Sequence, residues 1–333
     1  MILKSRNKKI KLPVKKTFLI IGVNPIIFKF LYELEKKGIS KNNIFILSES
    51  QRIDNDLKIR LLDYETKYID KDDHLEMINT ARKYNANICM VFGWYSILRK
   101  ELINHFDGLI FNLHFGDLPE YRGGGSFSWQ VLNGQKKLGA YIHQITNVVD
   151  GGGILLSVKG KIYRKIIYPK HFKKLSSELA EKLIKKLSKK IIHSSSLILF
   201  FQQQEISTYF PKLSTNLNGF INFSWNIKNV CKFVRAFSYP FKGAIFNYKD
   251  SKYYVKEAYI FKKKNIHPYA SGLILAVTNS SIHVALFDGI LRLEKIFNFN
   301  DLSPAEFSGF KPGGRLFNDN EKLFSAKILR SID

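Results

Sequence analysis

The chain has 333 residues, 45% of them hydrophobic, and a formal net charge of +25. This length and apolar content suffice for a sizeable core, and two ordinary domains fit them better than one large one. A charge of this size would normally indicate that the protein binds nucleic acid or an anionic ligand. Here the lysines are spread along the whole chain without one dense basic stripe, which favours a biased composition over a nucleic-acid-binding surface. Binding of an anionic small molecule remains compatible with the charge.

Residues 1–16 form a basic leader that lacks the apolar region of a signal peptide, because the following TFLIIGV is short and flanked like a core strand. No apolar run approaches the roughly 20 residues of a membrane span. Cys89 and Cys231 lie in apolar surroundings, which predicts free buried thiols in a reducing compartment. A cytoplasmic protein is therefore expected.

Short apolar runs alternate with helical patterns in the first part of the chain. Strands are predicted over residues 17–23, 43–47 and 87–92, and helices over residues 24–37 and 72–85. This alternation predicts a parallel sheet with helices on both faces. Ligands of such sheets bind beyond the carboxyl ends of the strands, where Gly22, Gly93 and His114 would lie.

The first strand-to-helix turn, IIGVNP, contains a single glycine, Gly22. The dinucleotide-binding fingerprint requires three glycines. A glycine that permits a tight turn is therefore favoured over a pyrophosphate cradle.

The middle of the chain continues with a strand that ends in FNLH, followed by a glycine triplet. The elements predicted after it are a short helix over SFSWQVL, a hairpin of residues 138–145 and 154–162, and a long amphipathic helix from residue 171 to about 201. The lysines of that long helix follow its periodicity, which favours a solvated outer face over a phosphate-binding surface.

Residues 204–218 break the pattern and predict a linker. After one helical segment within 222–237, five short runs follow, GAIFNY, YYVKEAYIF, GLILAVT, SIHVALF and ILRLEKIF, with Asp288-Gly289 as a hairpin turn. Such spacing indicates a small barrel or sandwich. The predicted organisation is a leader (1–16), an α/β catalytic domain (17–208) and a β-rich, barrel-like domain (209–333).

Three polar residues in the middle of the chain carry the chemistry. Asn112 and His114 are separated by one residue, so both side chains point to the same face of a strand. Asp150 follows 36 residues later, beside a glycine triplet, and only the fold can bring it near. An amide, an imidazole and a carboxylate together could polarise a carbonyl and take a proton from an attacking amine.

Other catalytic designs find little support. Ser126 and Ser128 lack a nucleophile-elbow motif, and the histidines form no metal-binding spacing, so neither a serine-hydrolase triad nor a metal site is expected. His143 is expected to be packed or hydrogen-bonded near the site. Alone, a histidine at a strand end is more often structural, and an aspartate before glycines is usually a turn residue.

A series of short motifs runs through residues 111–155. They are FNLHFGDLPEYRG, SWQVLNG, GAYIHQI and VVDGGGIL. Their order and spacing closely resemble the folate-dependent formyltransferase family. The second half, with FVRAFSYPFKGAIF and PGGRL, resembles the barrel-like, OB-like C-terminal domain of its longer members, and the first half their Rossmann-like catalytic domain.

The resemblance implies transfer of a formyl group from N10-formyltetrahydrofolate to a primary amine, without a metal. By position, Asn112 would stabilise the oxyanion, His114 would take or relay the proton, and Asp150 would orient that machinery and the folate. In the family the pterin lies beside the segment matching VFGWYSIL. The implied folate contacts are Phe92, Gly93, Trp94, Tyr95 and Ile97, with core packing as the alternative for Trp94 and Tyr95.

Two acceptor classes use this arrangement, initiator methionyl-tRNA and nucleotide-linked amino sugars. The GGGSFSWQVLNG segment and the LPEYRG loop look closer to the sugar enzymes, and IIGVNPIIF does not match the usual opening of the tRNA enzymes. We therefore expect a sugar N-formyltransferase acting on a dTDP- or similarly activated aminodeoxy sugar for surface polysaccharide. Tyr121, Arg122 and Gly123 are the candidate sugar or diphosphate contacts.

The sequence departs from the family in the acceptor loop. Gly116 replaces a serine of many members, and GGGSF lacks the proline that usually follows Arg-Gly. The shape of this loop, and with it the acceptor, is therefore open. Methionyl-tRNA formyltransferase and a non-catalytic folate- or nucleotide-binding module remain the alternatives, and the apolar second domain is a candidate homodimer interface.

Overall fold

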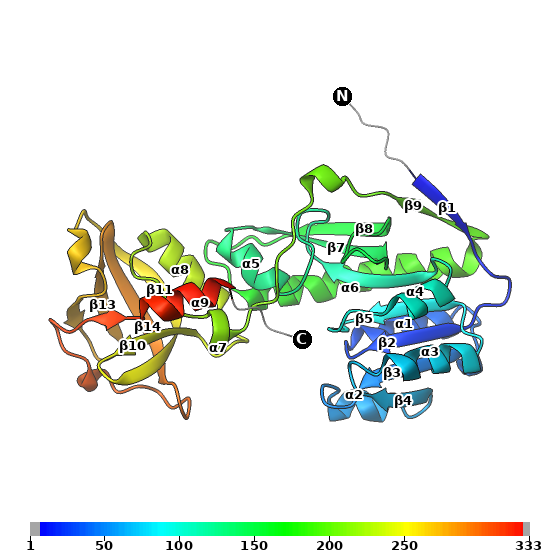
Figure 1. The fold of residues 1–333 in the computed structure, drawn as a ribbon, viewed down its shortest axis with the longest axis horizontal. Coiled ribbons are helices and arrows are strands. Elements are labelled where there is room, and N and C mark those ends of the chain that lie inside the picture. Colours follow the sequence, from blue (N-terminus) through cyan, green and yellow to red (C-terminus); the bar gives the residue numbers. More distant parts are fainter. Residues whose placement is uncertain (1–6, 329–333) are drawn as a thin grey trace.

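The computed structural model describes residues 7–328, and these form two units built on separate sheets (Figure 1). Residues 1–6 of the expected leader and residues 329–333 lie outside the described part. The first sheet has the order β1-β9-β8-β7-β6-β5-β2-β3-β4, and the second β12-β13-β14-β11-β10-β15. The predicted α/β fold with a second β-rich domain is confirmed, whereas the boundary at residue 208 stays a prediction.

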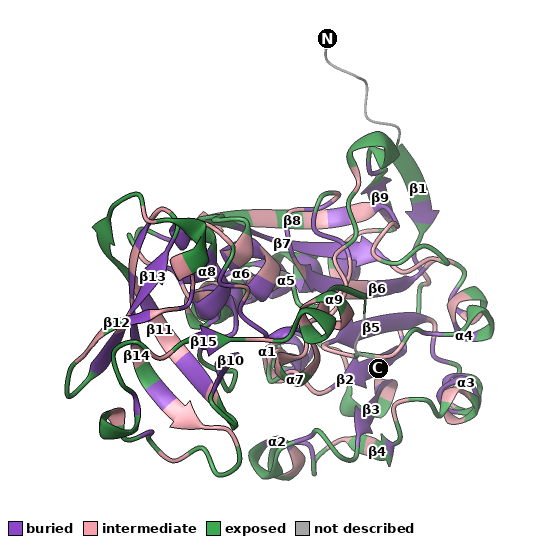
Figure 2. Cartoon of the chain, turned by 60° about the vertical axis from the view of Figure 1, so that its left-hand side comes forward, coloured by how far each residue is buried: buried purple, intermediate pink, exposed green. Residues whose placement is uncertain are grey.

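The parallel part of the first sheet runs from β6 to β4. Its strands are β2 (Phe18–Gly22), β3 (Ile44–Glu49), β4 (Glu65–Ile69), β5 (Ile88–Phe92) and β6 (Ile110–Phe115). β2, β3 and β5 are buried along their whole length, as expected for strands covered on both faces (Figure 2). The predicted strands are thus confirmed. β4 was not predicted, because its polar sequence ETKYI lacks the apolar run that marks a buried strand.

Helices cover both faces of this sheet. They are α1 (Ile26–Glu35), α2 (Asn55–Arg60), α3 (His74–Lys83) and α4 (Lys100–His105). Alternate residues of β2 belong to different cores: Phe18 and Ile20 pack in the cluster that contains α1, and Leu19 and Ile21 in the one that contains α3 and α4. The period-two alternation of a strand therefore divides the apolar side chains between two layers.

The other half of the sheet is antiparallel. It contains β7 (Lys137–Gln144), β8 (Ile154–Lys161), β9 (Ser196–Phe200) and β1 (Asn7–Lys11). The predicted hairpin of β7 and β8 is confirmed. Asn7–Lys11 belong to the segment set apart as a leader, yet they pair along β9 with only Ile10 buried.

The long helix ends earlier than expected. α6 spans Pro169–His193, and the residues predicted to prolong it to about residue 201 form β9 instead. The physical reason lies in Ser194 and its neighbours: the serines interrupt the leucine and lysine repeat, and Ser194 already has extended backbone. From there burial alternates with period two, so the sequence LILF belongs to a strand.

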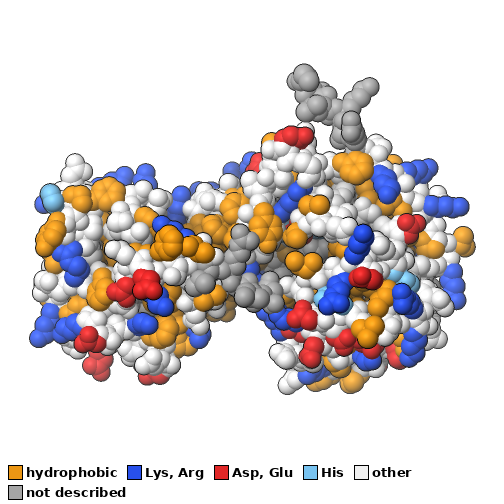
Figure 3. Space-filling model, viewed as in Figure 1, with side chains coloured by type: hydrophobic (Ala, Val, Ile, Leu, Met, Phe, Trp, Pro, Cys, Tyr) orange, Lys and Arg blue, Asp and Glu red, His pale blue; other side chains and the backbone are white. Residues whose placement is uncertain are grey.

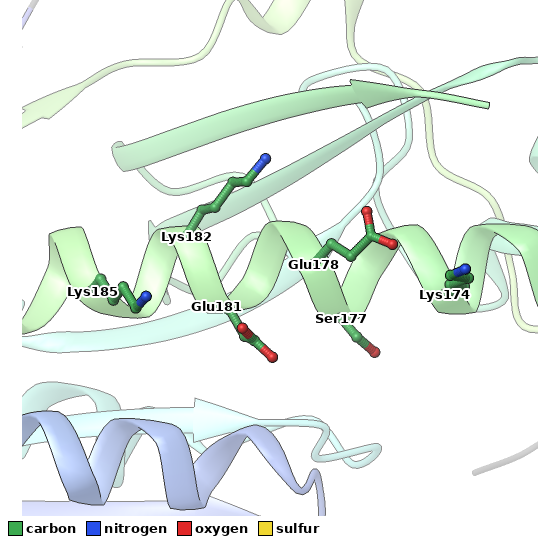
Figure 4. A pocket seen from close by; sticks show the side chains of 6 residues that line it. All are labelled: Lys174, Ser177, Glu178, Glu181, Lys182 and Lys185. Carbon is green, nitrogen blue, oxygen red and sulfur yellow. The ribbon is translucent and has the colours of Figure 1, made fainter. Parts of the chain in front are cut away.

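The polar face of α6 is solvated, as predicted. Phe172, Leu183 and Ile191 are fully buried. The side chains shown in Figure 4 are exposed and carry both signs of charge, namely Lys174, Ser177, Glu178, Glu181, Lys182 and Lys185. The two glutamates offset part of the lysine charge, which gives no support to a phosphate-binding surface.

The second unit is an antiparallel sheet with small helices. Its elements are α7 (Thr215–Asn218), α8 (Ile227–Ala236), β10 (Ala244–Tyr248), β11 (Ser251–Lys263), β12 (Ile274–Val277), β13 (Ser281–Leu286), β14 (Gly289–Asn298), β15 (Leu316–Phe317) and α9 (Asn320–Ile328). The predicted hairpin is present, but its turn falls on Phe287 and Asp288, one residue early. The units meet where α5 (Ser126–Leu132) packs on α8, and Ser128 Oγ donates to Ala236 O at 2.8 Å.

Gly22 lies at the carboxyl end of β2, against the backbone of β5. A Cβ on Gly22 would stand 2.1 Å from the carbonyl oxygen of Phe92, and its φ is +152°. The close approach of β2 and β5 therefore explains this glycine, whereas the sequence favoured a tight turn.

Gly22→Ala is expected to lower the free energy of unfolding by at least about 2 kcal/mol, because the strands would have to separate. Gly38→Ala is the matched control: its φ is +84° with nothing within 4 Å of the added Cβ. The control should lose only the left-handed strain of about 1 kcal/mol. Urea unfolding of both variants checks this, and equal losses would contradict the close approach.

Candidate active site

The candidate site lies on β6, where the parallel and antiparallel parts of the sheet meet. Asn112 and His114 are two residues apart on this strand, so their side chains share one face, as predicted. His114 is only 8% exposed. A buried imidazole and an amide are thus fixed by the sheet itself and not by a loop.

Asp150 joins them from the loop between β7 and β8. Its Oδ2 lies 3.4 Å from His114 Nδ1 and accepts the Gly123 N–H at 2.8 Å, while its Oδ1 lies 3.2 Å from His143 Nε2. Asn112 Nδ2 lies 3.3 Å from His143 Nε2. The fold therefore brings Asn112, His114 and Asp150 into one cluster, in which Asp150 bridges the two histidines and His143 links it to Asn112.

The imidazole of His114 is oriented by the chain that follows β6. Its Nε2 lies 2.6 Å from the carbonyl oxygen of Tyr121, which only accepts, so Nε2 carries a proton. The other nitrogen, Nδ1, faces Asp150. A neutral His114 and an ionised Asp150 can therefore take up one further proton between Nδ1 and Oδ2.

His143 lies on β7, directly opposite Asn112. Its Nδ1 lies 2.9 Å from the carbonyl oxygen of Gln144 and must donate there. Nε2 lies between the Asn112 amide, a donor, and Asp150 Oδ1, an acceptor. It accepts from the amide when unprotonated and donates to the carboxylate when protonated, so the hydrogen-bonded position expected for His143 is observed.

The electrostatics favour this proton-accepting state. Burial is the largest influence on His114 and lowers its pKa, against the raising effect of the Asp150 carboxylate. Burial alone would raise the pKa of Asp150, but His114, His143 and the Gly123 N–H together bring it below its usual range. Near neutral pH the carboxylate is therefore charged and His114 is neutral.

The three residues expected to contact the acceptor pack beneath the strap of residues 201–213. The Tyr121 ring stacks on Phe210 with centroids 5.0 Å apart. Arg122 is 5% exposed, and a Cβ on Gly123 would stand 2.3 Å from Phe210 O. These contacts support the loop beside Asp150, and an acceptor contact by these residues stays a prediction.

The strap also contributes two residues that sequence reasoning missed. Gln202 and Gln204 receive the Arg122 guanidinium: Nε and Nη2 donate to Gln202 Oε1 at 3.1 and 2.8 Å, and Nη1 donates to Gln204 Oε1 at 2.9 Å. The only signal in the sequence is the run of three glutamines at 202–204. Nothing in that run shows which residue turns inward.

The segment expected beside the folate follows β5. Phe92 is fully buried, Gly93 has a φ of +75°, and Trp94 packs on the core with its Nε1 buried and without a hydrogen-bond partner in the described chain. Tyr95 and Ile97 are exposed at 46% and 74%, and the Arg52 guanidinium stacks 4.0 Å over the Tyr95 ring. The end of this segment thus presents an aromatic and an apolar side chain to solvent.

The described side chains give little support to catalysis by a serine or cysteine nucleophile or by a metal ion. Ser128 is buried and bonded to a backbone carbonyl, so it does not serve as a nucleophile. Cys89 and Cys231 are buried free thiols, as predicted. Residues 7–328 hold no group of three or more His, Cys, Asp or Glu side chains arranged around a metal position. Within the same range, no helix combines the length and apolar character needed to cross a bilayer.

Comparison with known proteins identifies the family. Residues 15–187 match the family model described as formyl transferase, and residues 214–307 match that of the formyl transferase C-terminal domain. The methionyl-tRNA formyltransferase of Clostridium tetani is 29% identical over 229 residues, which make up 67% of this chain and 70% of that protein.

Solved structures share the fold. An N-formyltransferase from Helicobacter canadensis, in complex with folinic acid and dTDP-3-aminofucose, has a TM-score of 0.64 at 18% identity and covers 85% of this chain and 100% of its own. WlaRD, a sugar 3N-formyl transferase solved with dTDP and 5-N-formyl-THF, has a TM-score of 0.59 at 20% identity and covers 86% and 99%. With both family models matched in chain order, the chain belongs to the formyl transferase family.

Proposed function

We propose that this protein transfers a formyl group from N10-formyltetrahydrofolate to the primary amine of a nucleotide-linked aminodeoxy sugar, with a dTDP-sugar as the first candidate, in the cytoplasm and for surface polysaccharide biosynthesis. The observation that carries the transfer chemistry is the cluster of Asn112, His114 and Asp150 on one face of β6. It offers an amide donor and a proton acceptor, while Ser128 is bonded to Ala236 O and both cysteines are buried thiols. Direct transfer onto a bound amine is what such a cluster can perform.

In the proposed reaction the amine nitrogen bonds to the formyl carbon, and the carbonyl oxygen gains negative charge. Asn112 Nδ2 is placed to donate to that oxygen, and the charge it stabilises develops only in the transition state. The His114 and Asp150 pair takes the proton from the amine. The bond between the formyl carbon and the donor nitrogen then breaks, and the pair returns the proton to that nitrogen.

The residues after β5 fit the flat, apolar part of a folate donor. Tyr95 and Ile97 expose an aromatic and an aliphatic side chain, and the unpaired Trp94 Nε1 lies beside them. Lys212 Nζ lies 5.3 Å from the centre of the Tyr95 ring, and the Lys212 Cβ would stand 2.9 Å from a Cβ on Gly124. Residues of the strap therefore contact both the proposed donor segment and the glycine triplet of residues 123–125.

The choice of a sugar as acceptor rests on the extent of the structural likeness. The Helicobacter canadensis enzyme, solved with a dTDP-amino sugar, is covered over its whole length. The charge gives no contrary sign, because on the face shown in Figure 3 the Lys and Arg side chains are scattered among acidic and apolar ones without forming one stripe. The alternative acceptor is methionyl-tRNA, which the names of the Clostridium tetani and Rickettsia prowazekii relatives favour at 29% and 28% identity.

An acceptor panel separates these proposals. We expect release of tetrahydrofolate with a dTDP-linked 3-amino or 4-amino sugar, and none with initiator methionyl-tRNA. Kinetics on both, with the formylated product identified by mass spectrometry, check this result. Turnover with methionyl-tRNA alone would overturn the sugar assignment while leaving the formyl transfer intact.

A non-catalytic binding module of the same fold is the remaining alternative. It would bind folate or nucleotide without turnover on any amine. The joint presence of Asn112, His114 and Asp150 speaks against such a module, because a site that no longer catalyses transfer has little reason to keep all three residue types.

A further inference from the structure

Gln202 joins the strap to the backbone of the loop that carries Asp150. Its Nε2 donates to two carbonyl oxygens, those of Asp150 and Gly152, each at 2.7 Å. Gln202 is 7% exposed, and it lies 52 residues from Asp150 along the chain. A single buried amide thus holds both ends of the turn that presents the carboxylate.

Arg122 decides which way this amide points. Its Nε and Nη2 donate to Gln202 Oε1, so the amide nitrogen must face the Asp150 loop. The arginine is itself held by Gln204 and lies within the electrostatic influence of Asp150. The guanidinium therefore supports the backbone of the Asp150 turn through Gln202, in addition to its direct electrostatic interaction with the carboxylate.

The backbone of Asp150 needs such support. Its φ is +48°, in the left-handed region that costs a non-glycine residue free energy. In this conformation the two carboxylate oxygens reach His114 Nδ1 and His143 Nε2 from one side. If the turn relaxed, the carboxylate would move away from both imidazoles.

We infer that Gln202 is a positioning residue for formyl transfer, which fixes the Asp150 turn so that its carboxylate bridges the two histidines. This inference rests on the catalytic role proposed for Asp150. Only an amide side chain meets the requirement, because this position must accept from Arg122 and donate to Asp150 and Gly152 at once. A carboxylate at position 202 keeps the first function and loses the second.

Gln202→Glu tests the donor function directly. Its volume and its contact with Arg122 are retained, while both hydrogen bonds to the turn are lost. We expect kcat to fall about 10- to 100-fold, as small misplacements of catalytic groups do. KM for donor and acceptor should change by a smaller factor than kcat, because the variant keeps the contact with Arg122 and the main loss falls on the placement of the Asp150 carboxylate in the transition state.

The matched control is Gln203→Glu, which makes the same change at the neighbouring position, where the side chain is exposed. Gln202→Met allows the pH dependence of kcat to be measured, which would not change if Gln202 served only to stabilise the fold. It adds no charge, so a displaced Asp150 should lower the pKa of His114 and shift the acidic limb of kcat to lower pH. Circular dichroism and thermal unfolding verify that each variant is folded.

The outcomes are distinct. A fall in kcat for both Gln202 variants, with an unchanged Gln203→Glu, supports the inference. Folded Gln202 variants with kcat within about threefold of the wild type, while Asp150→Asn is impaired, overturn it and leave the catalytic assignment standing. Full activity of Asp150→Asn would overturn that assignment itself, and the inference with it.

Discussion

Asp150→Asn is expected to lower kcat by about 10²- to 10⁴-fold, the range associated with loss of acid–base catalysis. The substituted amide has the same size, and its oxygen can still accept the Gly123 N–H that Asp150 Oδ2 accepts at 2.8 Å. What is lost is the negative charge that stabilises a proton on His114. Steady-state kinetics of tetrahydrofolate release measure the effect.

The pH dependence of this variant has a definite sign. Asp150 raises the pKa of His114 against the lowering effect of burial. Without the carboxylate, the Tyr121 carbonyl alone opposes the lowering effects of burial and His143, so the pKa of His114 falls further and the acidic limb of the residual kcat should move to lower pH. Asp107→Asn is the control, since Asp107 also has left-handed backbone, with a φ of +43°, but is exposed. Similar losses in both variants would show a backbone effect and not a charge effect.

The strand period made part of this site predictable. Asn112 and His114 are two residues apart, which places both side chains on one face whatever the rest of the fold does. Asp150 was predictable only through the motif series, because no periodicity connects it to β6. Its contacts at 3.4 and 3.2 Å with two histidines depend on the turn between β7 and β8.

Gln202 was beyond sequence reasoning for a physical reason. Its partners are two backbone carbonyls, of Asp150 and Gly152, and a carbonyl has no residue type to mark it. In the fold, two of the strands that were missed have weak apolar patterns. β1 buries only Ile10, and in β4 only Ile69 is buried. Both segments become strands because they pair with a neighbouring strand, and such pairing is a tertiary contact that the local sequence does not reveal.

The error at the end of α6 has a similar origin. Leu197 and Leu199 are buried and continue the apolar content of the helix beyond the serines, so the apolar residues alone did not mark a change. The change is one of period, from four-residue to two-residue spacing, and only five residues of β9 display it. The shift matters for function because β9 leads directly into the strap that carries Gln202.

His114→Ala is expected to reduce kcat by about 10²- to 10⁴-fold, because the proton acceptor is removed. The variant also leaves the Tyr121 carbonyl without the Nε2–H that it accepts at 2.6 Å. A loss of activity could then reflect a displaced acceptor loop as well as a missing base. A second substitution is needed to separate the two effects.

His114→Gln makes that separation. The Nε2 of glutamine can replace the imidazole Nε2–H as donor to Tyr121, but glutamine has no nitrogen that takes up a proton at the pH of the reaction. If His114 is the base, both variants should lose similar factors in kcat. If its role is only to hold the loop, glutamine should restore most of the activity that alanine loses. His105→Ala is the control, since His105 Nε2 also bonds a backbone carbonyl, that of Ala86 at 3.1 Å, away from the cluster.

The pKa of His114 is lowered by burial, so the imidazole stays unprotonated in the wild type down to a pH below the usual histidine value of about 6.5. The wild-type kcat should therefore stay constant from neutral pH to below that value, and an acidic limb above it would contradict His114 as the base.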